Sequence, residues 1–221
     1  MDKWSYSSFS LFMQCPRKYY RLKVKKDIKE KLSTALIYGK SAHSAAEHYV
    51  KNNQPLPAKF SYLAQYLNIL KDIKGTQLCE FSMGLTRDLE PCGFYDKKAW
   101  WRGIADLIIL CDNRLAYVVD YKTGKSAKFA DTKQLDLLTI ATFKHFKVDY
   151  IKAALVFVVS QDLVKSKYAR NELDSLWAKF QPDIERMEMC YETDVWNPKE
   201  NFTCKKYCPV KDCEHNGAYR G

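Results

Sequence analysis

Residues 100–122 read WWRGIADLIILCDNRLAYVVDYK and decide the fold. Two runs rich in β-branched and aromatic residues, 100–111 and 115–121, flank the polar triplet Asp112-Asn113-Arg114. Such runs on either side of a short polar turn are typical of a β-hairpin. The stretch therefore predicts two antiparallel strands joined by a tight turn.

The predicted hairpin brings three charged side chains together. With Asn113 at the centre of the turn, Asp106 and Asp120 lie opposite each other, with Cβ atoms roughly 5 Å apart. Lys122, two residues further on, points to the same face as Asp120. Opposed carboxylates repel each other unless a cation lies between them, and Mg²⁺ prefers carboxylate oxygens. The alternative is a surface salt-bridge cluster at a strand end.

The segments around the hairpin predict an α/β fold with a mixed central sheet flanked by helices. Apolar residues at helical spacing alternate along the chain with short apolar runs typical of buried strands. Two prolines in NNQPLPAK end the first helix. The expected helices cover 34–51, 59–73, 130–146 and 169–191, and the further strands 78–83 and 152–159.

The composition excludes several classes of protein. Of 221 residues, 47% are hydrophobic and 28% are charged, which is typical of a globular chain. The longest purely apolar run, Ala153–Val159, is far shorter than the ~20 residues that span a bilayer. No secretory signal is recognisable at the N-terminus. We therefore expect a cytoplasmic protein, neither membrane-bound, secreted nor fibrous, and the net charge of +10 favours a polyanionic partner such as nucleic acid.

Three of the eight cysteines crowd into the C-terminal tail as Cys204-x3-Cys208-x4-Cys213. Without a secretory signal, metal binding is a better explanation than a disulfide framework. Zinc would use these three with Cys15 or His215, since Cys₄ and Cys₃His are both ordinary zinc sets. Free thiols on a polar tail are the remaining alternative.

Gly103-Ile-Ala-Asp106, followed by Val118-Val-Asp120-Tyr-Lys122-Thr-Gly-Lys125, resembles the core motif of PD-(D/E)XK nucleases, the RecB-like branch in particular. The resemblance implies a restriction-endonuclease-like core. It also implies that Asp106, Asp120 and His43 bind Mg²⁺ or Mn²⁺, with the Tyr121 carbonyl as an extra ligand. Lys122 would orient or deprotonate the attacking water.

Further positions resemble the same family. In Gly39-x3-His43-x3-Glu47, the three residues share one helix face, and RecB-like nucleases carry a metal-binding histidine in such a helix. Gln134 matches the first residue of a Q-x-x-x-Y motif, although Leu138 replaces the tyrosine. Glu80 lies where the family commonly has a glutamate. Taken alone, each of these is also an ordinary helix or strand residue.

The four cysteines Cys15, Cys204, Cys208 and Cys213 are similar to those of the iron–sulfur subset of RecB-like nucleases. The resemblance implies a [4Fe–4S] cluster that joins the chain ends, although the family usually has two residues, not three, between the first two tail cysteines. It also implies one nuclease domain, with a core at 34–191 and end segments 1–33 and 192–221 joined by the cluster.

Basic residues near the predicted site and cluster are candidate DNA contacts, because cations neutralise phosphates. The N-terminal segment interleaves such cations with tyrosines, which either stack on bases or pack on the core. The candidates are Arg17, Lys18, Lys125 and Lys128.

Together with the resemblance, the sequence predicts a metal-dependent DNA exonuclease. We expect it to act in the recombination, repair or processing of phage or mobile-element DNA. The alternatives are a CRISPR-adaptation-type nuclease and a non-catalytic metal-stabilised nucleic-acid-binding module. Because no G-x-x-x-x-G-K-[ST] helicase motif is present, unwinding would need a helicase or recombination partner. Ring-forming exonucleases in the superfamily make a homo-oligomer a further expectation.

Overall fold

The computed structural model describes residues 1, 3–29, 33–124, 126–128 and 130–220. The chain forms two compact units. The terminal unit combines Met1–Leu32 with Ala178–Gly221, and the central unit is Ser33–Trp177. The predicted division at 33/34 and 191/192 stays a prediction.

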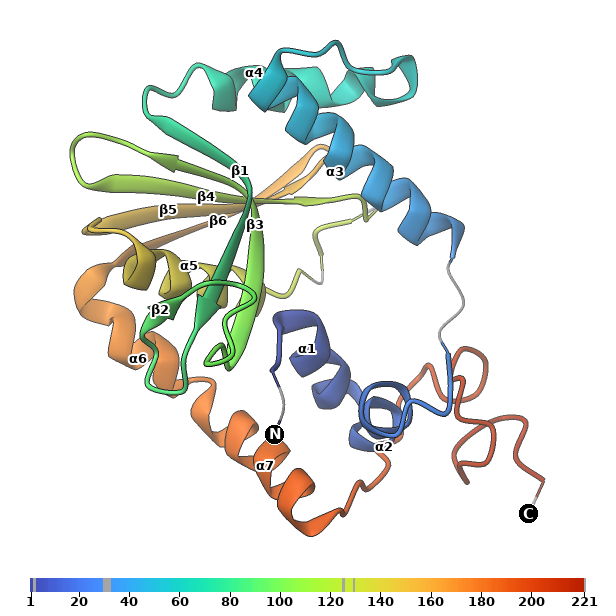
Figure 1. The fold of residues 1–221 in the computed structure, drawn as a ribbon. Coiled ribbons are helices and arrows are strands. Elements are labelled where there is room, and N and C mark those ends of the chain that lie inside the picture. Colours follow the sequence, from blue (N-terminus) through green and yellow to red (C-terminus); the bar gives the residue numbers. More distant parts are fainter. Residues whose placement is uncertain (2, 30–32, 125, 129, 221) are drawn as a thin grey trace. The chain divides into compact units, whose positions relative to one another are not determined.

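A six-stranded mixed sheet forms the centre of the central unit, with strand order β2-β1-β3-β4-β5-β6 (Figure 1). Only β4 and β5 pair in parallel among the described strands. This confirms the predicted α/β class with a mixed sheet. The strands are β1 Thr76–Leu85, β2 Pro91–Cys92, β3 Trp101–Leu110, β4 Leu115–Lys122, β5 Tyr150–Phe157 and β6 Asp162–Ala169.

Helices α3 (Thr34–Asn52) and α5 (Lys133–His145) lie on the two sides of the sheet (Figure 1). Because β4 and β5 are parallel, the chain must cross over between them, and α5 is that crossover. The long helix α3 lies on the opposite side (Figure 1). It begins at Ser33, whose hydroxyl accepts a hydrogen bond from the N–H of Leu36, as an N-cap should.

The main core lies between α3 and the sheet, together with the segment that follows α3. A 3₁₀-helix (Ala58–Leu63) leads into α4 (Ala64–Lys71), so the helix predicted over 59–73 is in fact two shorter elements. Their buried side chains pack against one face of the strands, whose alternate residues point to that face. The cluster includes Ala42, Ala46, Val50, Phe60, Leu63, Leu67, Leu107, Ile109, Val119, Tyr121, Val156 and Val158.

The end of the central unit and the first helix of the second terminal segment differ from the sequence prediction. β6 was not predicted, because an edge strand with exposed Lys165 and Lys167 lacks a continuous apolar run. The single helix predicted over 169–191 is instead a 3₁₀-turn, α6 (Leu173–Ala178) and α7 (Gln181–Thr193). Pro182 is the second residue of α7, in the first turn, where its missing N–H costs nothing.

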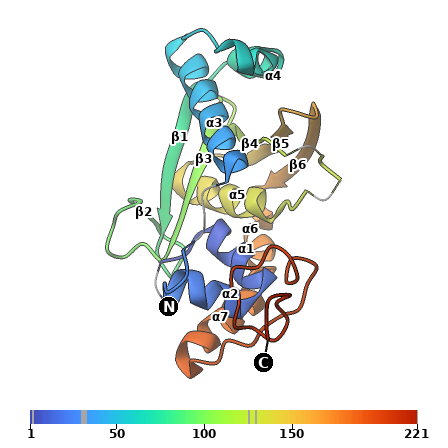
Figure 2. The ribbon, with the colours of Figure 1, turned by 90° about the vertical axis from the view of Figure 1, so that its right-hand side faces the viewer.

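The terminal unit joins the two ends of the chain through aromatic packing. Helices α1 (Tyr6–Gln14) and α2 (Pro16–Tyr19) continue into a π-helical turn, Tyr20–Val24. The hydroxyls of Tyr19 and Tyr191 lie 2.8 Å apart, and the ring of Tyr20 stacks on Trp196. Figure 2 shows α1, α2 and α7 in this unit beside the irregular C-terminal segment. Across the described parts of the chain, no helix is long and apolar enough to cross a membrane.

Candidate metal centre and catalytic cleft

Asp106 lies where the hairpin opens. The β3–β4 ladder has the predicted register, pairing Leu107 with Val119, and it ends at that pair. Beyond it, the backbone N–H of Tyr121 donates a 2.6 Å hydrogen bond to Oδ2 of Asp106 instead of to a main-chain carbonyl. The other oxygen, Oδ1, lies 3.0 Å from Nδ1 of His43 on α3. Both carboxylate oxygens of Asp106 are thus held in place.

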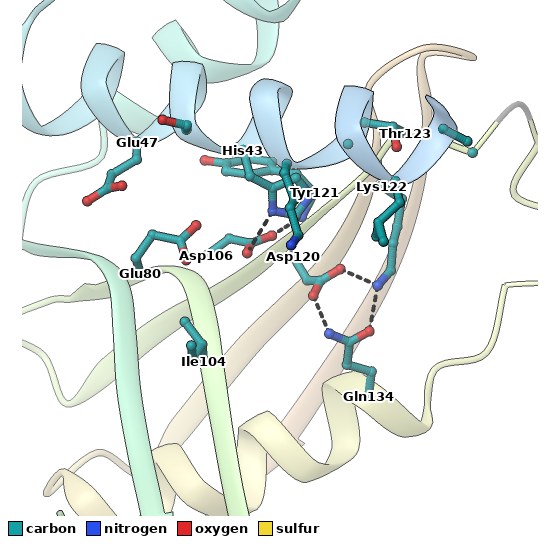
Figure 3. A pocket seen from close by; sticks show the side chains of 16 residues that line it. His43, Glu47, Glu80, Ile104, Asp106, Asp120, Tyr121, Lys122, Thr123 and Gln134 are labelled. Atoms are coloured by element: carbon teal, nitrogen blue, oxygen red, sulfur yellow. Dashed lines mark hydrogen bonds and ion pairs between the residues drawn. The ribbon is translucent and has the colours of Figure 1, made fainter. Parts of the chain in front are cut away.

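Asp120, Lys122 and Gln134 form a closed triangle of polar contacts (Figure 3). Nζ of Lys122 lies 2.7 Å from Oδ2 of Asp120. The amide of Gln134, at the start of α5, donates to Oδ1 of Asp120, and its carbonyl accepts from Lys122, both at 2.5 Å. Asp120 is buried, so these contacts replace the water that its charge has lost.

Glu80 also lies at the site, on β1, the strand that pairs with β3 on the side away from β4. The β1–β3 ladder is interrupted at Glu80, between the Cys79–Leu107 and Phe81–Ala105 pairs. Its φ of 47° lies in the left-handed region, which is uncommon for a residue other than glycine and marks local strain. One ligand atom from each of His43, Glu80 and Asp106 lies within 4.8 Å of the other two, a spacing that suits a metal ion. Sequence reasoning gave Glu80 only a secondary place.

The site carries excess negative charge at close range. Burial and the neighbouring charge of Asp106 raise the pKa of Glu80 to about 7. The same two causes raise the pKa of Asp120, although Lys122 opposes the shift. Burial lowers the pKa of His43, but its hydrogen bond to Asp106 and the surrounding carboxylates outweigh burial and raise it. A bound cation would offset the negative charge of these buried, mutually repelling carboxylates and so favour their ionised form.

These side chains line one open cleft of about 750 Å³ in the central unit. Its walls come from α3, the strands β1, β3 and β4, and the start of α5 (Figure 3). Glu47 also lines the cleft, and its Oε1 lies 3.5 Å from Nζ of Lys51. Oxygen-rich donors with one imidazole suit Mg²⁺ and Mn²⁺, so the residues present fit a divalent ion.

The predicted nucleic-acid contacts are more scattered. Lys125 lies outside the described residues, and Lys128 is exposed but does not line the cleft. In the terminal unit, Nη1 of Arg17 pairs with Glu214 at 2.8 Å, and Lys18 donates to the side chain of Gln14. Arg17 therefore has a structural partner that sequence reasoning did not anticipate.

The four cysteines Cys15, Cys204, Cys208 and Cys213 are all buried and line one small cavity of the terminal unit. The remaining cysteines do not line it. The backbone N–H of Lys199 donates to Sγ of Cys15 at 3.4 Å, and that of Asn201 donates to Sγ of Cys204 at 3.3 Å. Such N–H···S bonds stabilise thiolates that ligate a metal or cluster.

Ion pairs hold the tail beside the N-terminal helices. Arg17 pairs with Glu214, and Nη1 of Arg21 lies 2.6 Å from Asp212, so the two residues that flank Cys213 are both anchored. In the described part of the chain, no three cysteines bring their sulfur atoms within 4.8 Å of one another.

Comparison with known proteins gives a partial match. Residues 3–78 match the family model of the PD-(D/E)XK nuclease superfamily, a region that includes His43 but not the hairpin. A search among curated proteins found no match. A "putative exonuclease" from Eubacterium rectale superposes with a TM-score of 0.55 at 14% identity, over 94% of this chain and 87% of that one. This likeness shows a common fold.

A second solved structure, SSO0001, is less similar. It covers 95% of this chain and 84% of its own length at 15% identity, with a TM-score of 0.44.

Proposed function

We propose that this chain is a metal-dependent deoxyribonuclease that hydrolyses phosphodiester bonds, acting as an exonuclease from DNA ends. The observation that carries the proposal is the cleft in which Asp106, Glu80 and His43 converge beside the Asp120–Lys122 pair. The family match over residues 3–78 and the fold shared with the Eubacterium rectale protein support the same reaction class.

Each residue of the cleft has a proposed role in the hydrolysis. Water attacks phosphorus and loses a proton, and the bond to the leaving oxygen breaks while that oxygen takes up a proton, so that an alcohol and a phosphate monoester result. The ammonium of Lys122, already held by Asp120, donates to the attacking water and offsets negative charge on the phosphoryl oxygens. Gln134 fixes Lys122 and Asp120 relative to each other. The Tyr121 N–H orients Asp106, whose oxygens face the same cleft.

Asp106, Asp120, Glu80 and His43, with the Tyr121 carbonyl, are the residues proposed to hold Mg²⁺ or Mn²⁺. A divalent ion bound there would supply Lewis-acid chemistry, lowering the pKa of water and neutralising phosphate charge. Burial and the repulsion from Asp106 raise the pKa of Glu80, and the cation would offset both.

A [4Fe–4S] cluster held by Cys15, Cys204, Cys208 and Cys213 is the second part of the proposal. Its support is the shared cavity, the burial of all four thiols and the two N–H···S bonds. Its role would be structural, since hydrolysis needs no electron transfer. The same proposal includes a nuclease core at 34–191 with end segments 1–33 and 192–221. It also includes a cytoplasmic location and a role in phage or mobile-element recombination.

The decisive experiment is digestion of end-labelled linear DNA and closed circular DNA with Mg²⁺ or Mn²⁺, and with EDTA. We expect metal-dependent loss of the linear substrate and persistence of the circle. The Lys122→Ala protein, purified identically, is the matched control for contaminating nucleases. Cleavage of the circle would indicate an endonuclease, and activity that persists equally in Lys122→Ala or in EDTA would refute the proposed site.

A further inference from the structure

A second concave surface lies on α3, beside the catalytic cleft in the central unit. It has a volume of about 440 Å³, and it lies between α3 and the segment that joins α3 to α4. Two lysines, one histidine, hydroxyls and an amide line it, and no carboxylate does. The lining residues are Lys40, Ser41, Ser44, Ala45, His48, Gln54, Pro55, Pro57, Lys59 and Phe60. We call this surface the basic pocket.

The basic pocket and the cleft share two residues. Lys40 and Ser44 line both, so the two hollows meet along α3. The helical period explains why: residues four apart lie on neighbouring positions of one face. His43 and Glu47 face the cleft, and Lys40, Ser44 and His48 form the adjacent stripe. Lys40 and His48 are eight positions apart, which is ~12 Å along a helix axis.

The two lysines of the basic pocket are accessible to a ligand, and its histidine lies beside them. Lys40, His48 and Lys59 are all exposed. Nζ of Lys59 lies 4.9 Å from the ring centre of Phe60. Within the described residues, neither Lys40 nor Lys59 forms an ion pair. A hollow with positive charge, hydroxyls and no acid favours an anion, and phosphate in particular.

We propose that the basic pocket binds backbone phosphates of the substrate strand at a short distance from the cleavage point, through Lys40, His48 and Lys59. The inference rests on the proposed function, because the cleft defines where the strand must pass. The lining holds donors for phosphate oxygens but no set of side chains arranged to read base edges. The contact would therefore raise affinity for every sequence alike.

The test measures binding separately from cleavage. A labelled single-stranded oligonucleotide of 30 nucleotides is titrated in EDTA over a range of salt concentrations with wild type and with Lys40→Gln/Lys59→Gln. We expect roughly tenfold weaker binding at low salt, and a salt slope shallower by about 1.4, since each lost phosphate contact removes ~0.7 for a single strand. Lys165→Gln/Lys167→Gln removes the same charge from exposed positions of β6 and serves as the control.

The outcomes separate this inference from the proposed function. An unchanged salt slope in Lys40→Gln/Lys59→Gln, or an equal change in the β6 control, overturns the basic pocket even if wild type cleaves DNA. A shallower slope confined to Lys40→Gln/Lys59→Gln supports the pocket even if no cleavage is found. Both lysines are exposed, so thermal melting at the wild-type Tm is expected for both variants and excludes misfolding.

Discussion

The side-chain amide of Gln134 donates a 2.5 Å hydrogen bond from Nε2 to Oδ1 of Asp120, and its Oε1 accepts a hydrogen bond from Nζ of Lys122. One amide on α5 thus bridges the carboxylate and the ammonium that the β4 strand places two residues apart. Without it, Asp120 and Lys122 would still contact each other directly at 2.7 Å. The bridge therefore controls where the pair points more than whether it forms.

Gln134→Ala is expected to lower kcat by about 10²-fold, because a misplacement of ~1 Å at a reacting group costs about that much. The protein should keep its fold and its affinity for DNA measured in EDTA. Gln134→Glu, which keeps the length of the side chain but not its donor to Asp120, should not restore activity. Near wild-type turnover of Gln134→Ala in single-turnover assays would remove Gln134 from the site.

Lys122→Ala and Asp120→Asn are each expected to reduce cleavage by at least ~10³-fold, equal to ~4 kcal/mol of barrier. The physical reason is that water orientation and phosphate charge both depend on this pair. Binding of the oligonucleotide in EDTA should change little, because most affinity comes from backbone contacts elsewhere. Retention of full activity by either variant contradicts the assignment.

The stability of the metal-free protein should fall as pH rises from about 4.5 to about 7, because the pKa of Glu80 is raised over that range. A carboxyl whose pKa is raised by folding binds its proton more tightly in the folded state, so stability is greatest below the unfolded pKa and is lost through the folded pKa. Thermal melts in EDTA measure this. Glu80→Gln should show a shallower decline than wild type, and an identical decline would contradict the shift.

Adding Mg²⁺ or Mn²⁺ should reverse that trend. The ion binds carboxylates only when they have lost their protons, so its stabilisation should be small at pH 5 and larger at pH 8. Melting curves with and without the ion test this without any assay of cleavage. Glu47→Gln is a matched control, since Glu47 lines the cleft but is outside the His43–Glu80–Asp106 group. A metal effect that is independent of pH would point to binding elsewhere.

Cys15→Ser is expected to remove the brown colour and the broad absorbance near 400 nm of anaerobically purified protein, as is Cys213→Ser. Since a cross-link between ends that are more than 100 residues apart stabilises by about 5 kcal/mol in the loop-entropy picture, both variants should melt far below wild type. Cys190→Ser is the control, because Cys190 lies in the same unit but does not line the cavity. A colourless wild type containing one zinc would falsify the cluster.

Local sequence signals were enough to predict the hairpin and its register. The turn at Asn113 and the alternation along both strands fix which residues face each other, and Leu107 pairs with Val119 as expected. The class of fold followed from the order of the segments. These features depend on contacts between residues close in sequence, which a pattern can record.

Glu80 and β6 were harder because their positions depend on long-range contacts. Glu80 lies in the site because the β1–β3 ladder is interrupted there and its backbone is left-handed. Neither feature can be recognised from the amino-acid pattern. The strand β6 forms by antiparallel pairing with β5. Its alternating lysines are equally compatible with an exposed loop, so the sequence pattern alone does not indicate a strand. The pairing of Arg17 with Glu214 joins residues at opposite ends of the chain.

The terminal unit is made from two segments that leave the ribosome at different times. Its first part ends before Ser33, and its second begins at Ala178. At roughly 5–20 residues per second, the wait between them is about 7–30 s. Through that interval the ring of Phe12 has no Trp196 to pack against, and Cys15 is without the three tail cysteines that share its cavity. Translation speed and chaperone supply should therefore govern the yield of complete protein.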